Sequence, residues 1–96
     1  MRKEVMPAKI EIPSALQRFA GNNGAVEVPE GNVKQAMDNL IDQYGDLKEH
    51  LFDDQGMIRS FVNIYLNDED IRYEKNLDTE VKNGDVIQIV PSIAGG

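Results

Sequence analysis

The residues best suited to chemistry are the last four of the sequence, Ile93-Ala94-Gly95-Gly96. Terminal glycines pack nothing and are often only a frayed end. Here they follow an apolar run, Val86-Ile87-Gln88-Ile89-Val90-Pro91, that has strand character. The strand is expected to stop at Pro91, because proline lacks the N–H of a strand ladder. We therefore expect an exposed tail, residues 91–96, that presents the carboxylate of Gly96 to a narrow active site in another protein.

Few side chains compete with that carboxylate. The chain has no cysteine, which excludes disulfides, iron–sulfur clusters and thiol nucleophiles, and His50 is its only histidine. The acidic runs 53–54 and 68–70 lack the spacing of a calcium loop and are interpreted as solvated turns. By elimination the sequence predicts no catalytic side chain, no metal site and no bound cofactor. The candidate reactive group is the main-chain carboxylate of Gly96.

Composition indicates one globular domain over residues 1–96. The chain has 96 residues, 41% of them hydrophobic, and a formal net charge of −7. Such an acidic surface repels phosphate backbones and anionic lipids, so nucleic-acid and membrane partners are disfavoured, while partners with basic docking surfaces are favoured. Residues 1–7 are expected to be a loose leader without signal-peptide character, and the protein is expected to be cytoplasmic.

Two alternating stretches, residues 8–13 and 25–29, predict an antiparallel hairpin. A helix is expected to begin after Asn32, with Gln35 as its capping-box partner. Apolar residues then recur at helical spacing and form a stripe that we expect to face the core. The stripe comprises Val33, Ala36, Met37, Leu40, Ile41 and Tyr44.

The second half of the chain predicts the rest of the sheet. Residues 58–66 are the longest strand candidate, with Val62, Ile64 and Leu66 facing the core by period two. A helical turn is expected over residues 46–52, with Leu47, Leu51 and Phe52 as satellites of the core. Residues 71–73 are expected to form a short strand, and residues 77–81 a helical turn with Leu77 and Val81 as plugs.

These elements predict an α+β fold in which one main helix packs across a mixed sheet of four to five strands. The last strand is expected to run parallel to the first in the middle of the sheet. Phe61, Tyr65, Gln88 and Val90 would then share the outer face and form a partner interface. In the alternative interpretation, the leader or the segment 46–57 covers these side chains.

A resemblance now becomes apparent. Val62-Asn63, Leu77, Val81 and the turn Asn83-Gly84-Asp85, together with the last strand and the final Ala94-Gly95-Gly96, resemble the ubiquitin-like β-grasp sulfur carriers. These include the small subunit of molybdopterin synthase and the thiamine-pathway carrier. The stretch from Arg59 to Tyr73 is most similar to the carrier of the thiocarboxylate-dependent cysteine synthase pathway.

The resemblance implies a mechanism. An E1-like enzyme uses ATP to adenylate the Gly96 carboxylate, and a sulfur donor displaces AMP to leave a thiocarboxylate. A partner enzyme, either a pyridoxal-phosphate-dependent cysteine synthase or the large subunit of molybdopterin synthase, then takes the sulfur. In the cysteine branch a metalloprotease releases the new amino acid from the tail. The carrier itself supplies position and no catalytic side chain.

Two other classes of function remain open at this point. A protein modifier that forms isopeptide bonds with lysine would share the adenylation step. A purely non-covalent β-grasp interaction domain would not need Gly95 or Gly96 at all.

Overall fold

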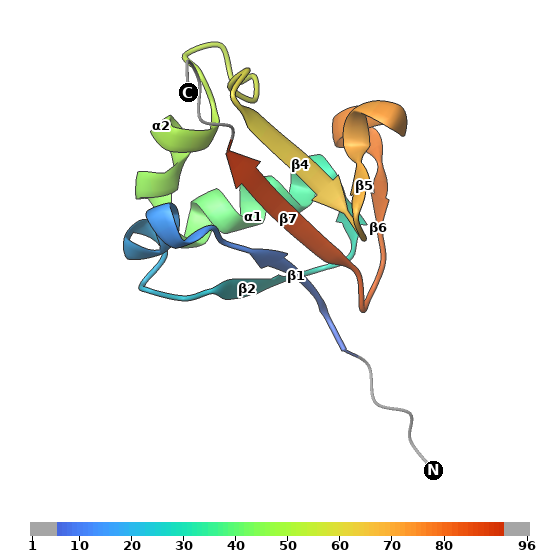
Figure 1. Cartoon of the computed structure of the whole chain (residues 1–96). Helices are drawn as coiled ribbons and strands as arrows, with labels where there is room; N and C mark the ends of the chain where they lie inside the picture. Colours follow the sequence, from blue (N-terminus) through green and yellow to red (C-terminus); the bar gives the residue numbers. More distant parts are fainter. Residues whose placement is uncertain (1–5, 92–96) are drawn as a thin grey trace.

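The computed structural model describes residues 6–91 and shows the expected α+β architecture. Five strands form the main sheet in the order β2-β1-β7-β4-β5 (Figure 1). Their bounds are β1 Ala8–Glu11, β2 Ala25–Val28, β4 Val62–Leu66, β5 Glu69–Asp70 and β7 Val86–Pro91. The fold class and the number of strands agree with the prediction from sequence.

The predicted hairpin and the central position of the last strand are confirmed. β1 pairs antiparallel with β2, so that Ile10 lies opposite Val26. On its other side β1 runs parallel to β7, where Ile10 lies opposite Ile87. β4 then pairs antiparallel with β7. The alternation of apolar residues explains this arrangement, because it gives each of these strands one side that the core can bury.

The main helix, α1, spans Val33–Gln43 and begins with the predicted capping box. The side-chain oxygen of Asn32 accepts a hydrogen bond from the backbone N–H of Gln35 at 2.8 Å. The side-chain oxygen of Gln35 in turn accepts one from the backbone N–H of Asn32 at 3.0 Å. Two of the unpaired donors at the helix start are thereby satisfied, which fixes where the helix begins.

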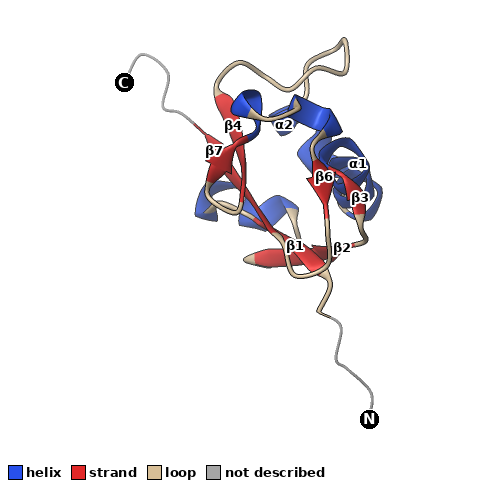
Figure 2. Cartoon of the chain, turned by 90° about the vertical axis from the view of Figure 1, so that its right-hand side faces the viewer, coloured by secondary structure: helices blue, strands red, loops and turns tan. Residues whose placement is uncertain are grey.

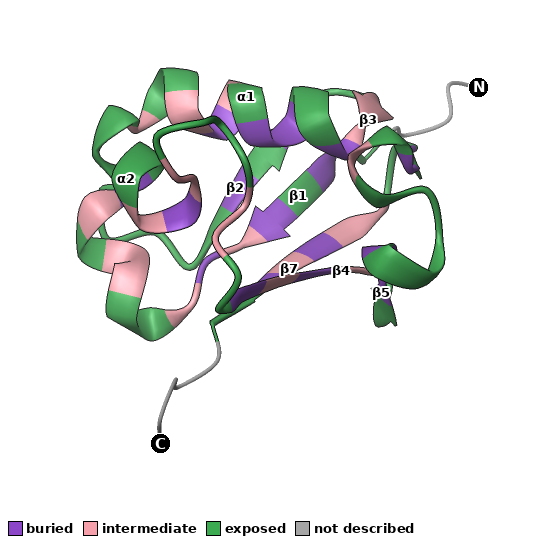
Figure 3. Cartoon of the chain, turned by 90° about the horizontal axis from the view of Figure 1, so that it is seen from above, coloured by how far each residue is buried: buried purple, intermediate pink, exposed green. Residues whose placement is uncertain are grey.

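The core lies between α1 and one face of the sheet. Figure 3 shows buried positions on the side of α1 that faces the strands and exposed positions on the opposite side. The predicted stripe is confirmed, because its members Val33, Ala36, Met37 and Leu40 are almost fully buried. Ile41 and Tyr44 are partly buried and pack against this core.

The segment after α1 contributes more to the core than predicted. It contains a 3-10 helix, Gly45–Leu47, and the short helix α2, Lys48–Leu51. Leu47 and Leu51 are fully buried, so the interpretation of these two side chains as satellites is wrong. Only Phe52 is partly buried, as expected. The helical turn directs both leucines inward because residues four apart lie on one face.

The strand predicted over residues 58–66 is shorter in the structure, which corrects its first half. β4 begins at Val62, and Ile58 instead forms an isolated bridge with Phe52. A turn separates the two, in which Val62 N donates to Arg59 O at 2.9 Å. β7 ends at Pro91, which lies opposite Val62, so within the described residues β7 offers no ladder partner to residues before 62.

The strand predicted over residues 71–73 is also wrong. Those residues form a 3-10 helix, Ile71–Tyr73, and the short strand β5 lies just before it. The reason is Asp70, whose carboxylate accepts a hydrogen bond from Arg72 N at 2.9 Å and caps the helical turn.

The remaining elements lie beside α1. A 3-10 helix forms at Ser14–Phe19, and another at Asn76–Asp78. The latter precedes β6, Glu80–Val81, which pairs with β3, Gly31–Asn32, at the start of α1 (Figure 2). Val81 is buried and Leu77 partly so, which confirms both as plugs. The helical turn predicted over residues 77–81 is wrong in its second half, because the 3-10 helix ends at Asp78 and Val81 lies in β6. Among residues 6–91 no helix is long and apolar enough to cross a membrane.

Candidate functional site

The strand that leads to the tail is held on both sides. β7 forms a parallel ladder with β1 and an antiparallel ladder with β4, and its last residue, Pro91, lies opposite Val62. Ile87 and Ile89 anchor it to the core, since both are buried. The ladder with β1 covers only residues 86–88, so the end of β7 is held by β4 alone, and the chain continues from it toward Gly96.

The predicted tail lies almost wholly outside the described residues. Pro91 is described, whereas Ile93, Ala94, Gly95 and Gly96 are not. Their assignment as the tail and as the site of adenylation therefore stays a prediction.

Three of the four predicted interface residues lie on the outer face of the sheet. Tyr65 lies opposite Gln88 in the ladder between β4 and β7, and Asn63 lies opposite Val90. Side chains on paired residues point to the same side of a sheet, so one contiguous surface is formed by Tyr65, Gln88, Asn63 and Val90. Val90 is 41% exposed, whereas Tyr65 and Gln88 are partly buried among their neighbours.

Phe61 does not share this ladder, which corrects its predicted place on the strand beside Tyr65. It lies in the turn before β4, although its side chain is 41% exposed. Its exposure fits a contact residue at the rim of the surface, near the end of β7. Sequence alternation alone could not find the break, because residues 58–66 contain no glycine or proline that would mark the end of a strand.

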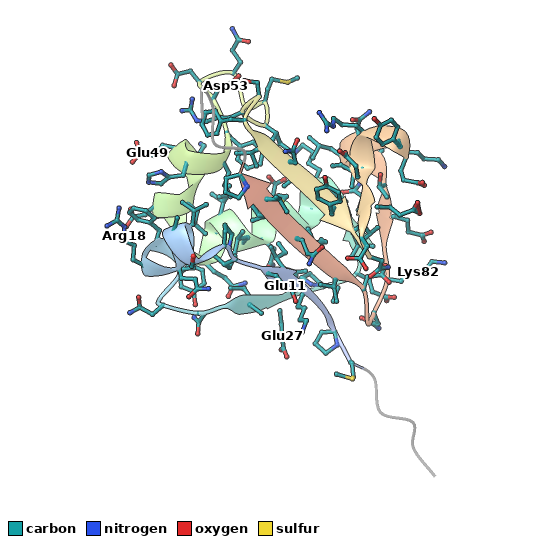
Figure 4. All side chains as sticks on the ribbon, viewed as in Figure 1. Glu11, Arg18, Glu27, Glu49, Asp53 and Lys82 are labelled. Atoms are coloured by element: carbon teal, nitrogen blue, oxygen red, sulfur yellow. The ribbon has the colours of Figure 1, made fainter. Side chains whose placement is uncertain are left out.

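A polar contact that the sequence did not predict holds the middle of the outer face. The Gln88 side-chain amide donates to the Glu11 carboxylate at 3.1 Å, and these two residues are also register partners of β7 and β1. Figure 4 shows Glu11 on β1 beside β7. The sequence pattern indicated only that Glu11 is a polar residue in an alternating strand. Its contact with Gln88 could have been predicted from the parallel register of β1 and β7. The hydrogen bond fixes the orientation of Gln88 next to Tyr65.

The segment 46–57 does not cover this face. Its leucines enter the core at the end of α1, and the figures show α1 on the opposite side of the sheet from the outer face. The alternative interpretation is therefore wrong for this segment. Residues 1–5 of the predicted leader lie outside the described part of the chain.

The shortest ion pair among residues 6–91 lies at the β5 edge of the sheet, where Asp70 is opposite Tyr65 in the ladder between β4 and β5. Arg72 binds Asp70 through Nη2 at 2.6 Å, and Asp70 is only 8% exposed, so the interpretation of this acidic run as a solvated turn is wrong at that residue. The side-chain hydrogen bonds from Arg72 are the main cause that holds the pKa of the Asp70 carboxyl below its ordinary value of 3.8. Within residues 6–91 no group of three or more acidic or histidine side chains is arranged to hold a metal ion.

Comparison with known proteins identifies the family. Residues 10–96 match the ThiS family over most of the chain. The chain belongs to the ThiS family. A sulfur carrier protein CysO from Mycobacterium bovis is 33% identical over 93 residues, which cover 95% of this chain and all of the relative.

Solved structures agree with this assignment. The ThiS-family chain superposes on the crystal structure of the Amycolatopsis orientalis BexX/CysO complex with a TM-score of 0.83 and 32% identity, covering 93% of this chain and 99% of the other. It superposes on small archaeal modifier protein 1 from Methanosarcina acetivorans with a TM-score of 0.81 and 26% identity, covering 98% and 100%. The fold is thus the ubiquitin-like β-grasp that the sequence resemblance implied.

Proposed function

We propose that this chain is a sulfur carrier in cysteine biosynthesis, with Gly96 as the residue that carries the sulfur. One observation supports this proposal above the others. β7, the central strand of a ThiS-family domain, ends at Pro91 and leads directly to the final Gly-Gly of the sequence. The similarity to proteins named CysO favours the cysteine branch over other sulfur pathways.

The proposed chemistry takes place on the main chain. A Gly96 carboxylate oxygen attacks the α-phosphorus of ATP on an E1-like enzyme, and pyrophosphate leaves. A sulfur donor at the level of sulfide then attacks the carbonyl carbon and displaces AMP, which leaves a C-terminal thiocarboxylate. Adenylation is needed because a free carboxylate is a poor acyl donor until it bears a good leaving group. The thiocarboxylate sulfur finally bonds to an activated serine-derived acceptor on a cysteine synthase that uses pyridoxal phosphate, so the new amino acid is at first joined to Gly96. Hydrolysis by a metalloprotease then releases the amino acid and restores the Gly96 carboxylate.

The carrier's part in this scheme is positioning. Glycine has no Cβ, so Gly95 and Gly96 can enter a channel that a larger residue would block. The sheet provides the surface that a partner enzyme grips, with Tyr65, Gln88 and Val90 on the outer face and Phe61 at its rim. A CysO from Amycolatopsis orientalis was crystallised in a complex with BexX, which supports the idea that such a domain docks on a partner protein.

The proposal is tested by intact-mass spectrometry. The chain is incubated with an E1-like activating enzyme, ATP and sulfide, and we expect the mass increase that replaces one oxygen by sulfur. Fragmentation should place the change on Gly96. A chain that lacks Gly96 is the matched control and should show no increase. If the full chain keeps its oxygen with cognate activators from the sulfur pathways, the proposal is wrong.

A second function is favoured by one comparison. The similarity to small archaeal modifier protein 1 supports a role as a protein modifier that is joined to lysine side chains. This use would give heavier adducts of the chain on other proteins, linked through Gly96. Affinity capture under denaturing conditions, followed by peptide mapping of the linkage, separates the two functions.

A further inference from the structure

A groove of about 390 Å³ lies along β4 and is lined by two core-facing residues of that strand, Val62 and Ile64, and by Asn63 between them. Val62 and Ile64 of β4 and Ile71 and Leu77 of the 3-10 helices form its apolar floor. Residues 57–60 also line it. Its volume is in the range of sites that bind small ligands or short peptide segments.

The charge around this groove is opposite to that of the whole molecule. The sequence has 17 acidic and 10 basic residues, yet the residues that line the groove include Arg59 and Arg72 and no aspartate or glutamate. Arg72 is already bound to Asp70. Arg59 donates through Nε to the carbonyl oxygen of Glu49 at 2.7 Å and has no ion pair among residues 6–91. The groove therefore favours an apolar group attached to an anion.

The C-terminal segment of this chain has that composition and starts at the right place. Val62 lines the groove and lies opposite Pro91, so the described part of the chain ends beside the groove. Five residues extend at most about 17 Å, whereas Val62 and Ile64 of β4 are only about 7 Å apart. Residues 92–96 are therefore long enough to reach along the groove. The segment carries one large apolar residue, Ile93, followed by the carboxylate of Gly96.

We propose that residues 92–96 dock reversibly in this groove, with Ile93 on the apolar floor and the Gly96 carboxylate beside Arg59. The inference rests on the proposed function only in taking Gly96 as the terminal, reactive residue. Docking shields the carboxylate until an activating enzyme competes for the tail. An exposed ion pair contributes little free energy, so the tail can be withdrawn at small cost.

The test uses a spin label on the isolated full-length chain. The protein has no cysteine, so Ala94→Cys provides a single attachment site for a nitroxide. Paramagnetic broadening of backbone amide signals then reports which surface the tail visits. We expect strong broadening at Ile64, Arg72 and Leu77 in the groove and weak broadening at Lys9 and Glu27 on the outer side of the sheet. Reduced nitroxide supplies the diamagnetic reference.

Variants identify the contacts. Arg59→Gln should lower the broadening in the groove by about one-and-a-half- to fivefold, the range that one exposed ion pair allows. Ile93→Ser should also lower it, because it removes the apolar side chain that is proposed to occupy the floor of the groove. Lys82→Gln is the matched control, because it also removes one positive charge. Lys82 follows β6 and lies far from the loop that contains Asp53 (Figure 4). This control variant should leave the broadening unchanged.

Three results would overturn the inference. The first is broadening on the outer face in place of the groove, and the second is weak broadening spread evenly over both. The third is equal broadening in a mixture of spin-labelled chains without ¹⁵N and ¹⁵N-enriched chains without a spin label. Broadening there arises between molecules, so the occupant of the groove would be a second copy of the chain. No enzyme or ATP is present, so failure of the sulfur-carrier proposal would not alter these spectra, and failure here would not alter the mass test.

Discussion

Tyr65 of β4 lies directly opposite Gln88 of β7, and both side chains lie on the outer face of the sheet. The side-chain amide of Gln88 also donates a hydrogen bond to the Glu11 carboxylate at 3.1 Å. Tyr65 therefore lies next to a hydrogen-bonded pair of fixed orientation. Tyrosine is enriched among the few interface residues that contribute most of the binding energy. The register therefore singles out Tyr65 as the centre of the proposed partner surface.

The first prediction concerns this anchor. Tyr65→Ala should weaken binding of the activating enzyme about tenfold, because truncation of a buried interface tyrosine removes an anchor worth about 1–2 kcal/mol. Isothermal titration calorimetry with the enzyme measures the change in Kd. Tyr73→Ala is the matched control, since Tyr73 is 85% exposed and lies in the 3-10 helix after β5. Equal losses for the two variants would contradict the assignment of the outer face.

The second prediction concerns the rim residue Phe61. Phe61→Asp should weaken the same binding while the chain stays folded, because the side chain lies in a turn and is 41% exposed. Circular dichroism checks the fold, and calorimetry checks the binding. An unfolded variant would show that Phe61 supports the core, and a folded variant with unchanged Kd would place it outside the interface.

The parts of the fold that the sequence predicted are those with strong local signals. The hairpin follows from two alternating runs joined by Asn22-Asn23-Gly24, and the helix start follows from Asn32 and Gln35. The central place of β7 followed from its position after a hairpin and a helix, which favours a parallel pairing with β1. In each case the local pattern and the tertiary contacts agree.

The misses have a common physical cause, which is tertiary context. Ile58 has strand propensity but bridges to Phe52, and β4 cannot extend before Val62 because β7 ends opposite it at Pro91. Asp70 was expected in solvent, yet its hydrogen bonds to Arg72 convert the next residues into a helical turn. Period two alone predicted that Tyr65, Gln88 and Val90 share the outer face, whereas the contact of Glu11 with Gln88 follows from the parallel register.

The third prediction concerns the two leucines whose role the sequence understated. Leu47→Ala and Leu51→Ala should each lower the free energy of unfolding by about 2–5 kcal/mol, because both side chains are fully buried and truncation leaves a cavity. Urea denaturation followed by circular dichroism gives the values. Met57→Ala, at a side chain that is 60% exposed, should change stability by no more than about 0.5 kcal/mol. Similar costs at all three sites would contradict the core assignment.

The fourth prediction concerns the capping box of α1. Asn32→Ala should cost about 1 kcal/mol of unfolding free energy, the usual value for losing an N-cap side chain. Gly31→Ala should also cost stability, because its new Cβ would collide with the Gln35 side-chain oxygen and its φ of +153° disfavours a side chain. In a Gln35→Ala background that collision is gone, so Gly31→Ala should cost less there. Strictly additive values in this double-mutant cycle would contradict the steric coupling.

The last prediction concerns pH. The pKa of Asp70 is lowered in the folded chain, first by the side-chain hydrogen bonds from Arg72 and then by the backbone one. A group whose pKa is depressed on folding binds fewer protons in the folded state, so its stabilising effect is present above the ordinary value of 3.8 and is lost as pH falls through the lower folded value. Wild type should therefore exceed Asp70→Asn in unfolding free energy at neutral pH, and the difference should shrink in strong acid. Asp38→Asn removes the same charge from the exposed Lys34–Asp38 pair and is the matched control for the change in net charge. Urea titrations of the three proteins across the acid range measure these differences, and a gap between wild type and Asp70→Asn that stays constant with pH would contradict the assignment.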